Sequence, residues 1–515
     1  MPALLPQIFS ENAERYAGKD AIAYQGRRVT YSELWQTALK VSAFLRRNGV
    51  TAGDRVAILV QNSPEYVAIN YGVWLVGGVT VPLNTQASDV DITHWLKHSG
   101  AKILFCDAGY AKLNLLVQEN PVDAYLVIVD TTTNSDADVE NVFPASWGAV
   151  LKEIPLAHVA AVAGDGIATI IYTSGTTGAP KGVTLSHGNL AANTAAIVEY
   201  LDLTEHDSIV NVLPFFYSYG NSVLHTHLAV GGTVWLENSL VYPHQVVNTM
   251  AKAKVTGFAG VPSTYALLMS RLDLSGFDLS SLRYMTQAGG PMPVTHIERL
   301  RAAIPKIKLI VMYGQTEATA RLSFLPPERL IDKLGSAGKA IPGVRLEIRD
   351  ELGVKVAAGV KGEIYAKGDN IMIGYWQNAE ATKTVLIDGW LKTGDLAYMD
   401  EEGYIFIHGR SSEIIKTGAF RVSPIEIEEV ILELSDIVEV GATGIADDIL
   451  GEVIMAVVIV RAGCRIEARA IQAHCRKRLP AYKVPKIIVF SDSLPKTATG
   501  KVKRALLALM KKETL

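Results

Sequence analysis

The stretch Tyr172-Thr-Ser-Gly-Thr-Thr-Gly-Ala-Pro-Lys-Gly182 holds three glycines, four Ser or Thr hydroxyls and one lysine. It follows the apolar run Ile167-Ala-Thr-Ile-Ile171 and precedes Gly182-Val-Thr-Leu185, whose alternation predicts a second strand. Glycine lets a backbone approach an anion closely, hydroxyls and N–H groups donate to phosphate oxygens, and lysine adds positive charge. The stretch therefore predicts strand, phosphate-binding loop, strand, with an ordinary glycine-rich turn as the alternative.

The position of the lysine separates this loop from that of a P-loop NTPase. A P-loop places Gly-Lys-Ser or Gly-Lys-Thr at the start of a helix. Here Lys181 stands between Pro180 and Gly182, and a strand is predicted to follow. The sequence therefore disfavours a P-loop NTPase.

Composition indicates a globular protein of several domains. The 515 residues suggest about two to four domains, and 49% hydrophobic residues, 20% charged residues and a net charge of −3 give no reason to expect nucleic acid or an acidic membrane as a partner. Cys106, Cys464 and Cys475 are widely spaced, which fits a reducing compartment and argues against structural zinc. The N-terminus lacks a basic targeting region, and the most apolar stretch, residues 72–83, is too short to span a bilayer. We expect a cytoplasmic enzyme.

Strands and helices alternate through the first three hundred residues. Thr30-Tyr-Ser-Glu33 is a capping box that opens a helix ending near Asn48. Alternation of strand and helix indicates a parallel sheet. We expect helices near residues 64–76 and 189–200, and strands near 54–60, 79–83, 102–106, 124–129, 208–212, 233–236, 257–259 and 308–311.

The pattern changes twice toward the C-terminus. From about Gly338 short strands and glycine turns predict a small β-rich subdomain. After Arg410 a small α+β domain is expected, in which Ser423-Pro-Ile-Glu426 forms a capping box before a helix. Residues 461–515 hold fourteen basic residues against three acidic ones, which indicates either a solvated surface or a landing site for a phosphorylated or acidic partner.

Four further segments carry unusual side chains. Tyr313-Gly-Gln-Thr-Glu317 follows a predicted strand, where open α/β sheets bind ligands, and its carboxylate could coordinate Mg²⁺. Gly389-Trp-Leu-Lys-Thr-Gly-Asp395 is expected to place an acid in a tight turn, suited to ribose hydroxyls. Gly409-Arg-Ser-Ser-Glu-Ile-Ile-Lys416 carries a cation on each side of the expected domain boundary, and Pro495-Lys-Thr-Ala-Thr-Gly-Lys501 presents a lysine on a glycine turn. Each segment alone is consistent with a purely structural role.

Together and in this order, the five motifs resemble those of the adenylate-forming (AMP-dependent synthetase and ligase) superfamily, of acyl-CoA synthetase type. The resemblance extends from Thr30 to about Leu507. It implies an α/β fold in which residues 1–410 form a large N-terminal adenylation domain, built of stacked α/β sheets and a small β-rich subdomain, with the acyl and ATP sites. Residues 411–515 would form a small, mobile α+β domain.

The resemblance also implies the chemistry and its residues. A carboxylic acid and ATP, with Mg²⁺, would give an acyl-adenylate and pyrophosphate, after which a thiol takes the acyl group. Lys501 would bridge the attacking carboxylate and the α-phosphate, Thr316 would touch the α-phosphate and Glu317 would bind the metal. The remaining residues implied to bind the nucleotide are Thr173, Ser174, Thr176, Thr177 and Lys181 at the β- and γ-phosphates, Ala288, Gly289, Gly290 and Tyr313 at adenine, Asp395 at the ribose, and Arg410 close to the ribose or a phosphate.

Relatives rotate the C-terminal domain between the two half-reactions. The hinge would fall on Ser412, where many relatives have Asp or Lys, and Lys416 matches a lysine used in thioester formation. Gly418-Ala419 departs from relatives with glycine at the second position, which leaves the local geometry of the thiol tunnel open.

The substrate is expected to be an uncharged organic acid, aliphatic or aromatic. Residues 215–222 contain no acid that could pair with an α-ammonium group, which disfavours amino acids, and Tyr217 replaces a histidine found in many acyl-CoA synthetases. The resemblance places around the acyl group, or in the ordinary core beside it, Tyr217, Asn221, Ala259, Val261, Thr264 and Thr319.

The acceptor has two candidates. Coenzyme A fits a chain without an attached carrier domain, and an acyl carrier protein would suit the same basic stretch. A luciferase-like oxygenase is a lesser alternative, and a non-catalytic nucleotide binder is disfavoured because the charged positions of the motifs are present. No nucleic acid or integral membrane partner is expected, and a homodimer stays open.

Overall fold

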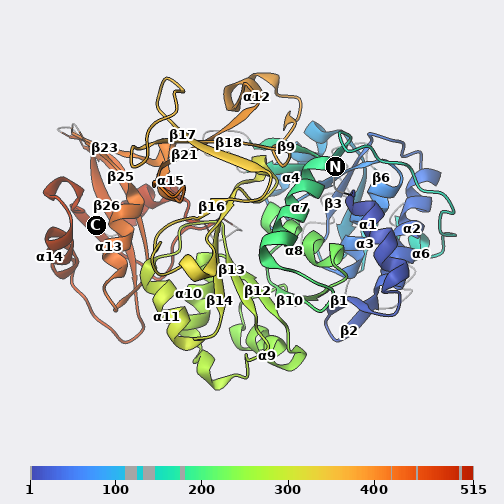
Figure 1. The fold of residues 1–515 in the computed structure, drawn as a ribbon, viewed down its shortest axis with the longest axis horizontal. Coiled ribbons are helices and arrows are strands. Elements are labelled where there is room, and N and C mark those ends of the chain that lie inside the picture. Colours follow the sequence, from blue (N-terminus) through green and yellow to red (C-terminus); the bar gives the residue numbers. More distant parts are fainter. Residues whose placement is uncertain are drawn as a thin grey trace.

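The computed structural model describes residues 3–110, 125–130, 145–173, 180–418, 420–447, 450–497 and 501–513 (Figure 1). The centre of the predicted phosphate loop, with Ser174, Thr176 and Thr177, lies outside the described residues, as does Ala419. Within the described chain, no helix is long and apolar enough to cross a membrane.

An eight-stranded sheet contains the strands on both sides of the predicted phosphate loop. The first two pairs in the order below are antiparallel, and the other five are parallel. Its order is β19 (Gly374–Tyr375), β9 (Lys181–Ser186), β8 (Ile167–Thr173), β4 (Val79–Pro82), β3 (Arg55–Leu59), β5 (Ala101–Asp107), β6 (Tyr125–Val129), β7 (Ala145–Ser146).

A nine-stranded sheet provides the second layer. Its central strands β10 to β14 and β1 are parallel, and its two ends are antiparallel hairpins. Its order is β16 (Lys339–Ala340), β15 (Ser323–Phe324), β14 (Lys308–Tyr313), β13 (Tyr284–Gln287), β12 (Gly257–Gly260), β10 (Ser208–Asn211), β11 (Thr233–Leu236), β1 (Asp20–Tyr24), β2 (Arg27–Thr30).

Helices between and outside these sheets bury alternate strand residues. Val56 and Ile58 of β3 face the main core, whereas Ala57 and Leu59 face a separate core formed with Trp95 of α4. Such near-continuous apolar strands are typical of parallel sheets that are covered on both faces. The helices of this part are α1 (Leu5–Arg15), α2 (Tyr31–Arg47), α3 (Pro64–Leu75), α4 (Asp89–Ser99), α6 (Trp147–Leu151), α7 (His187–Leu201), α8 (Ser218–Ala229), α9 (Pro243–Ala253), α10 (Pro262–Arg271) and α11 (Val294–Ala303).

The predicted β-rich subdomain is a five-stranded antiparallel sheet. It comprises β17 (Val344–Arg349), β18 (Gly362–Gly368), β20 (Leu386–Ile387), β21 (Trp390–Met399) and β22 (Ile405–Arg410), and α12 (Ala379–Val385) packs beside it. The prediction that Asp395 lies in a tight turn is wrong. Gly394 has the positive φ of a turn residue (+79°), but pairing with β18 and β22 keeps Asp395 inside strand β21.

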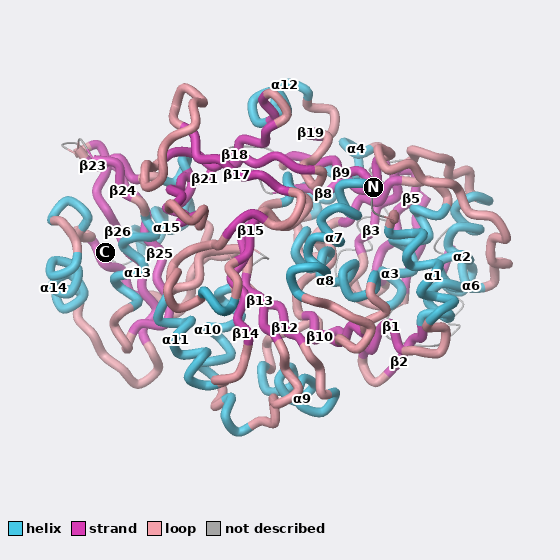
Figure 2. Tube along the Cα trace, viewed as in Figure 1, coloured by secondary structure: helices cyan, strands magenta, loops and turns pink. Residues whose placement is uncertain are grey.

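The chain after Arg410 forms a second, smaller α+β unit. Its sheet holds β23 (Ile415–Thr417), β24 (Phe420–Val422), β25 (Ile437–Asp447), β26 (Gly451–Val460) and β27 (Ile487–Phe490). Figure 2 shows this sheet beside its helices α13 (Pro424–Leu432), α14 (Ala468–Arg478) and α15 (Arg504–Leu507).

The second predicted capping box forms only in part. The Ser423 side chain accepts a hydrogen bond from Ile425 N and so caps α13, as expected of a Ser-Pro start. The Glu426 carboxylate does not complete the box, because it forms ion pairs with Lys483 and, across to the larger domain, with Lys361 (3.8 Å). Tertiary charge pairing has replaced the local contact.

Glycine at position 72 is required for close packing of α2 on α3. A Cβ atom there would lie 2.6 Å from Val41 Cβ and 2.9 Å from the backbone oxygen of Ala38. The same crossing places Ser42 Oγ 2.8 Å from the Gly72 carbonyl oxygen, to which it donates.

We predict that Gly72→Ala destabilises the N-terminal domain by about 1–3 kcal/mol, although alanine favours helix more than glycine does, because overpacking outweighs propensity. Urea denaturation measures the change. Gly18→Ala is the matched control, since no atom lies within 4 Å of its added Cβ. A Gly72→Ala protein as stable as wild type would contradict this packing argument.

Candidate active site

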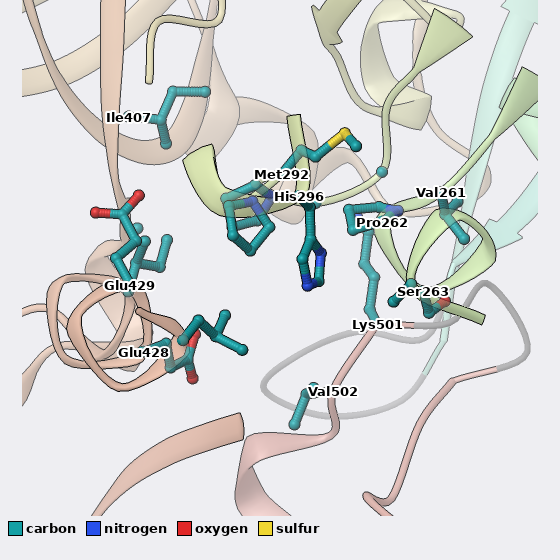
Figure 3. Close-up of a pocket in the computed structure, with 18 of the residues that line it drawn as sticks. Val261, Pro262, Ser263, Met292, His296, Ile407, Glu428, Glu429, Lys501 and Val502 are labelled. Atoms are coloured by element: carbon teal, nitrogen blue, oxygen red, sulfur yellow. The ribbon is translucent and has the colours of Figure 1, made fainter. Parts of the chain in front are cut away.

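A cavity of about 320 Å³ lies between the larger domain and the C-terminal unit. The larger domain contributes segments that follow β12, β13 and β14, and the C-terminal unit contributes α13, β25 and residues 501–504. In Figure 3, the Lys501 side chain points toward Pro262, with His296 and Ser263 on its two sides, and Glu428 and Glu429 line another side of the same cavity.

Parallel pairing brings the nucleotide motifs together. Strands β12, β13 and β14 run side by side in the same direction, so the segments that follow them meet at one edge of the sheet. Gly289 and Gly290 follow β13 and line the cavity, with Tyr313 at the end of β14. Gly289 has φ +91°, and a Cβ there would lie 3.1 Å from Val261 Cγ1. Both the backbone conformation and the contact with Val261 therefore favour glycine at this position of the cavity wall.

Asp395 is buried and held from two sides. The Tyr313 hydroxyl donates to Asp395 Oδ2 (2.6 Å), and Arg410 Nε lies 3.2 Å from Asp395 Oδ1. The second contact follows from the antiparallel pairing of Asp395 with Arg410. The negative charge of Asp395 raises the pKa of Arg410. A fixed carboxylate at this position can accept hydrogen bonds from hydroxyl groups of a ligand.

Glu317 stands in the 3₁₀ turn Thr316–Ala318 directly after β14, as the sequence predicted for a strand's carboxyl end. Its Oε1 accepts a hydrogen bond from the Tyr375 hydroxyl (3.0 Å), and Thr316 Oγ1 lies 3.4 Å from Ser218 Oγ. Among the described residues no cluster of three His, Cys, Asp or Glu side chains could hold a metal by itself. One carboxylate fits Mg²⁺ that arrives with a nucleotide, because such ions take most of their ligands from phosphate and water.

The two ends of the predicted phosphate loop are adjacent. Thr173 and Lys181 pair directly in the β8–β9 hairpin, which confirms the strand–loop–strand arrangement. Lys181 Nζ lies 4.9 Å from the centroid of the Tyr375 ring. Tyr375 therefore touches both Lys181 and Glu317, although no local motif marked it in the sequence.

Lys501 lines the cavity, and two hydrogen bonds join it to Thr497. Its backbone N–H donates to Thr497 Oγ1 (3.1 Å), and Thr497 N–H donates to the Lys501 carbonyl oxygen (2.7 Å). Burial of the ammonium group and the nearby Arg410 lower the pKa of Lys501, while Asp395, Glu317 and Glu413 raise it. The residue as a whole keeps an exposed surface, so solvent moderates this shift.

Lys416 lies elsewhere on the same C-terminal unit. It is exposed on β23 and is not among the residues that line the cavity. Ser412, the predicted hinge, stands in the exposed turn Ser411–Glu413 between β22 and β23. The structure thus brings together Lys501, Asp395, Arg410 and Tyr313, and separates them from Lys416.

Only one of the six residues predicted to surround the acyl group is among the described residues that line the cavity. Val261 lines it, but the other five are absent from its described lining. Thr264 Oγ1 accepts from Val261 N–H (3.3 Å), and Thr319, at φ +64°, donates to the Asn370 carbonyl oxygen (2.7 Å). Ala259 and Asn221 are buried. The cavity also includes His296, which the sequence did not single out and whose pKa burial lowers to about 4.

Comparisons with known proteins now identify the family. Residues 9–376 match the family of AMP-binding enzymes, and residues 426–501 match the C-terminal domain of AMP-binding enzymes. The chain belongs to the AMP-binding enzyme family. This confirms the resemblance to adenylate-forming enzymes that the five motifs indicated.

The AMP-binding enzyme is similar to CoA ligases over almost its whole length. A long-chain-fatty-acid–CoA ligase of Bacillus subtilis is 32% identical over 99% of this chain and 94% of that protein. Indoleacetate–CoA ligase of Aromatoleum aromaticum is 32% identical over 96% of each. The structure of the anthranilate CoA ligase AuaEII in complex with anthranoyl-AMP superimposes with a TM-score of 0.91 at 26% identity, covering 99% of this chain and 98% of that one.

The expected α/β fold and reaction class are therefore confirmed. The enzyme is an AMP-forming ligase that activates a carboxylic acid with ATP and Mg²⁺ and transfers the acyl group to coenzyme A.

Proposed function

We propose that this ligase acts on an uncharged carboxylic acid and that Lys501 is the cation on which adenylation depends. The observation that carries the assignment is the shared cavity of Lys501, Asp395, Arg410 and Tyr313, with Gly289 beside them. In this orientation the C-terminal unit contributes the lysine and the larger domain contributes the nucleotide-binding side chains.

The proposed first step needs cations more than acid–base catalysis. A carboxylate oxygen of the acid bonds to the α-phosphorus of ATP, and the bond from that phosphorus to the bridging oxygen of pyrophosphate breaks. The acid is already ionised at neutral pH, so no proton has to be removed. Two anions must approach each other, and Lys501 and Arg410 would hold the negative charge that gathers between them.

The nucleotide is proposed to be oriented by fixed groups. Asp395 would accept hydrogen bonds from ribose hydroxyls, Tyr313 and Ala288–Gly290 would enclose adenine, and Thr316 would donate to the α-phosphate. Thr173, Lys181 and the loop between them would bind the β- and γ-phosphates. When bound, Mg²⁺ supplies neutralising positive charge at the phosphate oxygens, and Glu317 would hold it.

The second step is assigned to Lys416. Residues 411–515 are proposed to be a mobile domain that turns about Ser412. The exposed position of Ser412 between β22 and β23 supports its role as the hinge. After rotation, Lys416 would take the place near the acyl group that Lys501 occupies in this structure.

The proposed acyl site contains no charged side chain. Tyr217 is its one ionisable member, and burial raises the pKa of Tyr217 to about 12, so that it is neutral at physiological pH. With Asn221, Ala259, Val261, Thr264 and Thr319, it would border a neutral aliphatic or aromatic acyl group. The named relatives that act on fatty acids, indoleacetate and anthranilate agree with this class.

An acyl carrier protein is the second candidate acceptor, besides coenzyme A. Part of the basic excess of residues 461–515 is neutralised internally, because Lys483, Lys496 and Arg504 form ion pairs with glutamates. Arg465, Arg469, Arg476 and Lys477 remain exposed on and beside α14, where an acidic carrier surface could dock.

A pyrophosphate-release screen over fatty, aromatic and short acids, with coenzyme A or a carrier protein present, tests this proposal. We expect AMP and pyrophosphate with an uncharged acid, and thioester formation on coenzyme A. Formation of ADP and phosphate would overturn the adenylation chemistry, whereas thioester formation on the carrier alone would overturn the choice of acceptor.

We predict that loss of Lys501 impairs adenylation and that loss of Lys416 impairs thioester formation. Lys501→Ala should slow acid-dependent ATP–pyrophosphate exchange by about two to three orders of magnitude, because it removes the charge-stabilising cation, yet spare thioester formation from supplied acyl-adenylate. Lys416→Ala should leave exchange within about twofold and slow thioester formation. Equal loss of both steps in either variant would contradict the division.

The pH dependence of adenylation should follow Lys501. The protonated lysine is the active form, so exchange should fall as pH rises through its pKa, and burial and Arg410 place that fall below the ordinary lysine value of 10.5. Glu413→Gln removes a charge that raises this pKa and should move the alkaline limb to lower pH. Glu401→Gln, at an exposed turn, is the control. An alkaline limb that stays in place in Glu413→Gln would count against the assignment.

A further inference from the structure

One aromatic side chain stands between the two oppositely charged groups that serve the phosphates. The Tyr375 hydroxyl donates to Glu317 Oε1 (3.0 Å), and Lys181 Nζ lies 4.9 Å from the centroid of the Tyr375 ring. Among the described residues, no ion pair joins Lys181 directly to Glu317. The Tyr375 hydroxyl contacts the carboxylate, and the Tyr375 ring contacts the ammonium group.

The backbone around Tyr375 is fixed to both neighbours. In β19, Tyr375 pairs with Val183 of β9, and Trp376 N–H donates to the Gly182 carbonyl oxygen (2.7 Å). On the other side, Met372 N–H donates to the Glu317 carbonyl oxygen (2.9 Å). The ring therefore occupies a place set by two segments that are far apart in the sequence.

Close approach of these strands requires glycine at position 182. A Cβ there would lie 2.9 Å from Ile170 Cγ2 and 3.2 Å from Trp376 Cβ. Gly182, next to Lys181, thus has a packing function, because it lets β19 lie against β9. This pairing places Tyr375 beside Lys181.

We propose that Tyr375 is a positioning residue that holds Lys181 and Glu317 apart, so that both charges stay available for ATP and its metal ion. The inference rests on the proposed roles of these two residues. A lysine and a glutamate that face the same site attract each other, and a direct ion pair would neutralise both. The aromatic face holds the ammonium group without neutralising it, and the hydroxyl orients the carboxylate while leaving its other oxygen free.

Binding of ATP in the presence of EDTA isolates the lysine from metal effects. In Tyr375→Ala, Lys181 should pair with Glu317, and we expect ATP affinity, measured by isothermal titration calorimetry, to fall about tenfold. The double variant Tyr375→Ala/Glu317→Gln should recover most of the loss, because the lysine no longer has a carboxylate partner. A purely structural role for Tyr375 predicts no such recovery.

Tyr375→Phe separates the two contacts. It keeps the ring between the charges, so ATP affinity in EDTA should stay within about twofold of wild type. It removes the hydrogen bond that orients Glu317, so Mn²⁺ binding to the enzyme–ATP complex, followed by electron paramagnetic resonance, should weaken several-fold, roughly. Tyr365→Ala is the control, because the face of the Tyr365 ring also carries a cation (Arg349 Cζ, 4.8 Å), whereas the contacts to Lys181 and Glu317 belong to Tyr375.

The outcomes separate this inference from the proposed function. Wild-type protein that binds no ATP would overturn the proposed function itself. Wild-type binding with unchanged affinity in Tyr375→Ala, or equally weak binding in the single and double variants, would overturn the role of Tyr375 alone. If Tyr375→Ala does not fold, unchanged Mn²⁺ affinity in Tyr375→Phe decides against it.

Discussion

The parallel alignment of β12, β13 and β14 is the constraint on which the site depends. Since neighbouring strands run in one direction, their carboxyl ends meet at one edge and present Val261, Gly289 and Tyr313 to the same cavity. Each motif is local in the sequence, but its chemistry depends on this register. A loss of pairing between β13 and β14 would separate the glycines from Tyr313 and, through Tyr313, leave Asp395 without one of its two partners.

The C-terminal unit completes the site through polar contacts near the domain boundary. Glu426 joins Lys361 of the larger domain to Lys483 of its own, and the Ser423 hydroxyl donates to the His408 carbonyl oxygen. Ion pairs of this partly exposed kind are individually weak. The arrangement suits a domain that has to leave its position during turnover, as proposed for residues 411–515.

Much of the fold was predictable because apolar periodicity and turn residues act locally. The β8–β9 hairpin and the helix after Thr30 follow from such patterns and are found where expected. Asp395 was misplaced because Gly394 indicates a turn, whereas two neighbouring strands impose an extended chain. Tyr375 was missed because its significance arises only when β19 lies between β9 and Glu317, a juxtaposition that no local pattern encodes.

Lys501 and Lys416 belong to one folded unit, with the first in the cavity and the second exposed on β23. Under the roles proposed above, this unit would present one lysine to the acyl group in each orientation, so the two steps would take place one after the other. With the roles proposed here, Lys501 would have left the active site before the acyl-adenylate reacts with the thiol. The cation that also favours the reverse reaction of the adenylate with pyrophosphate would then be absent. The placement of the two lysines on one unit would then favour thioester formation over the reversal of adenylation.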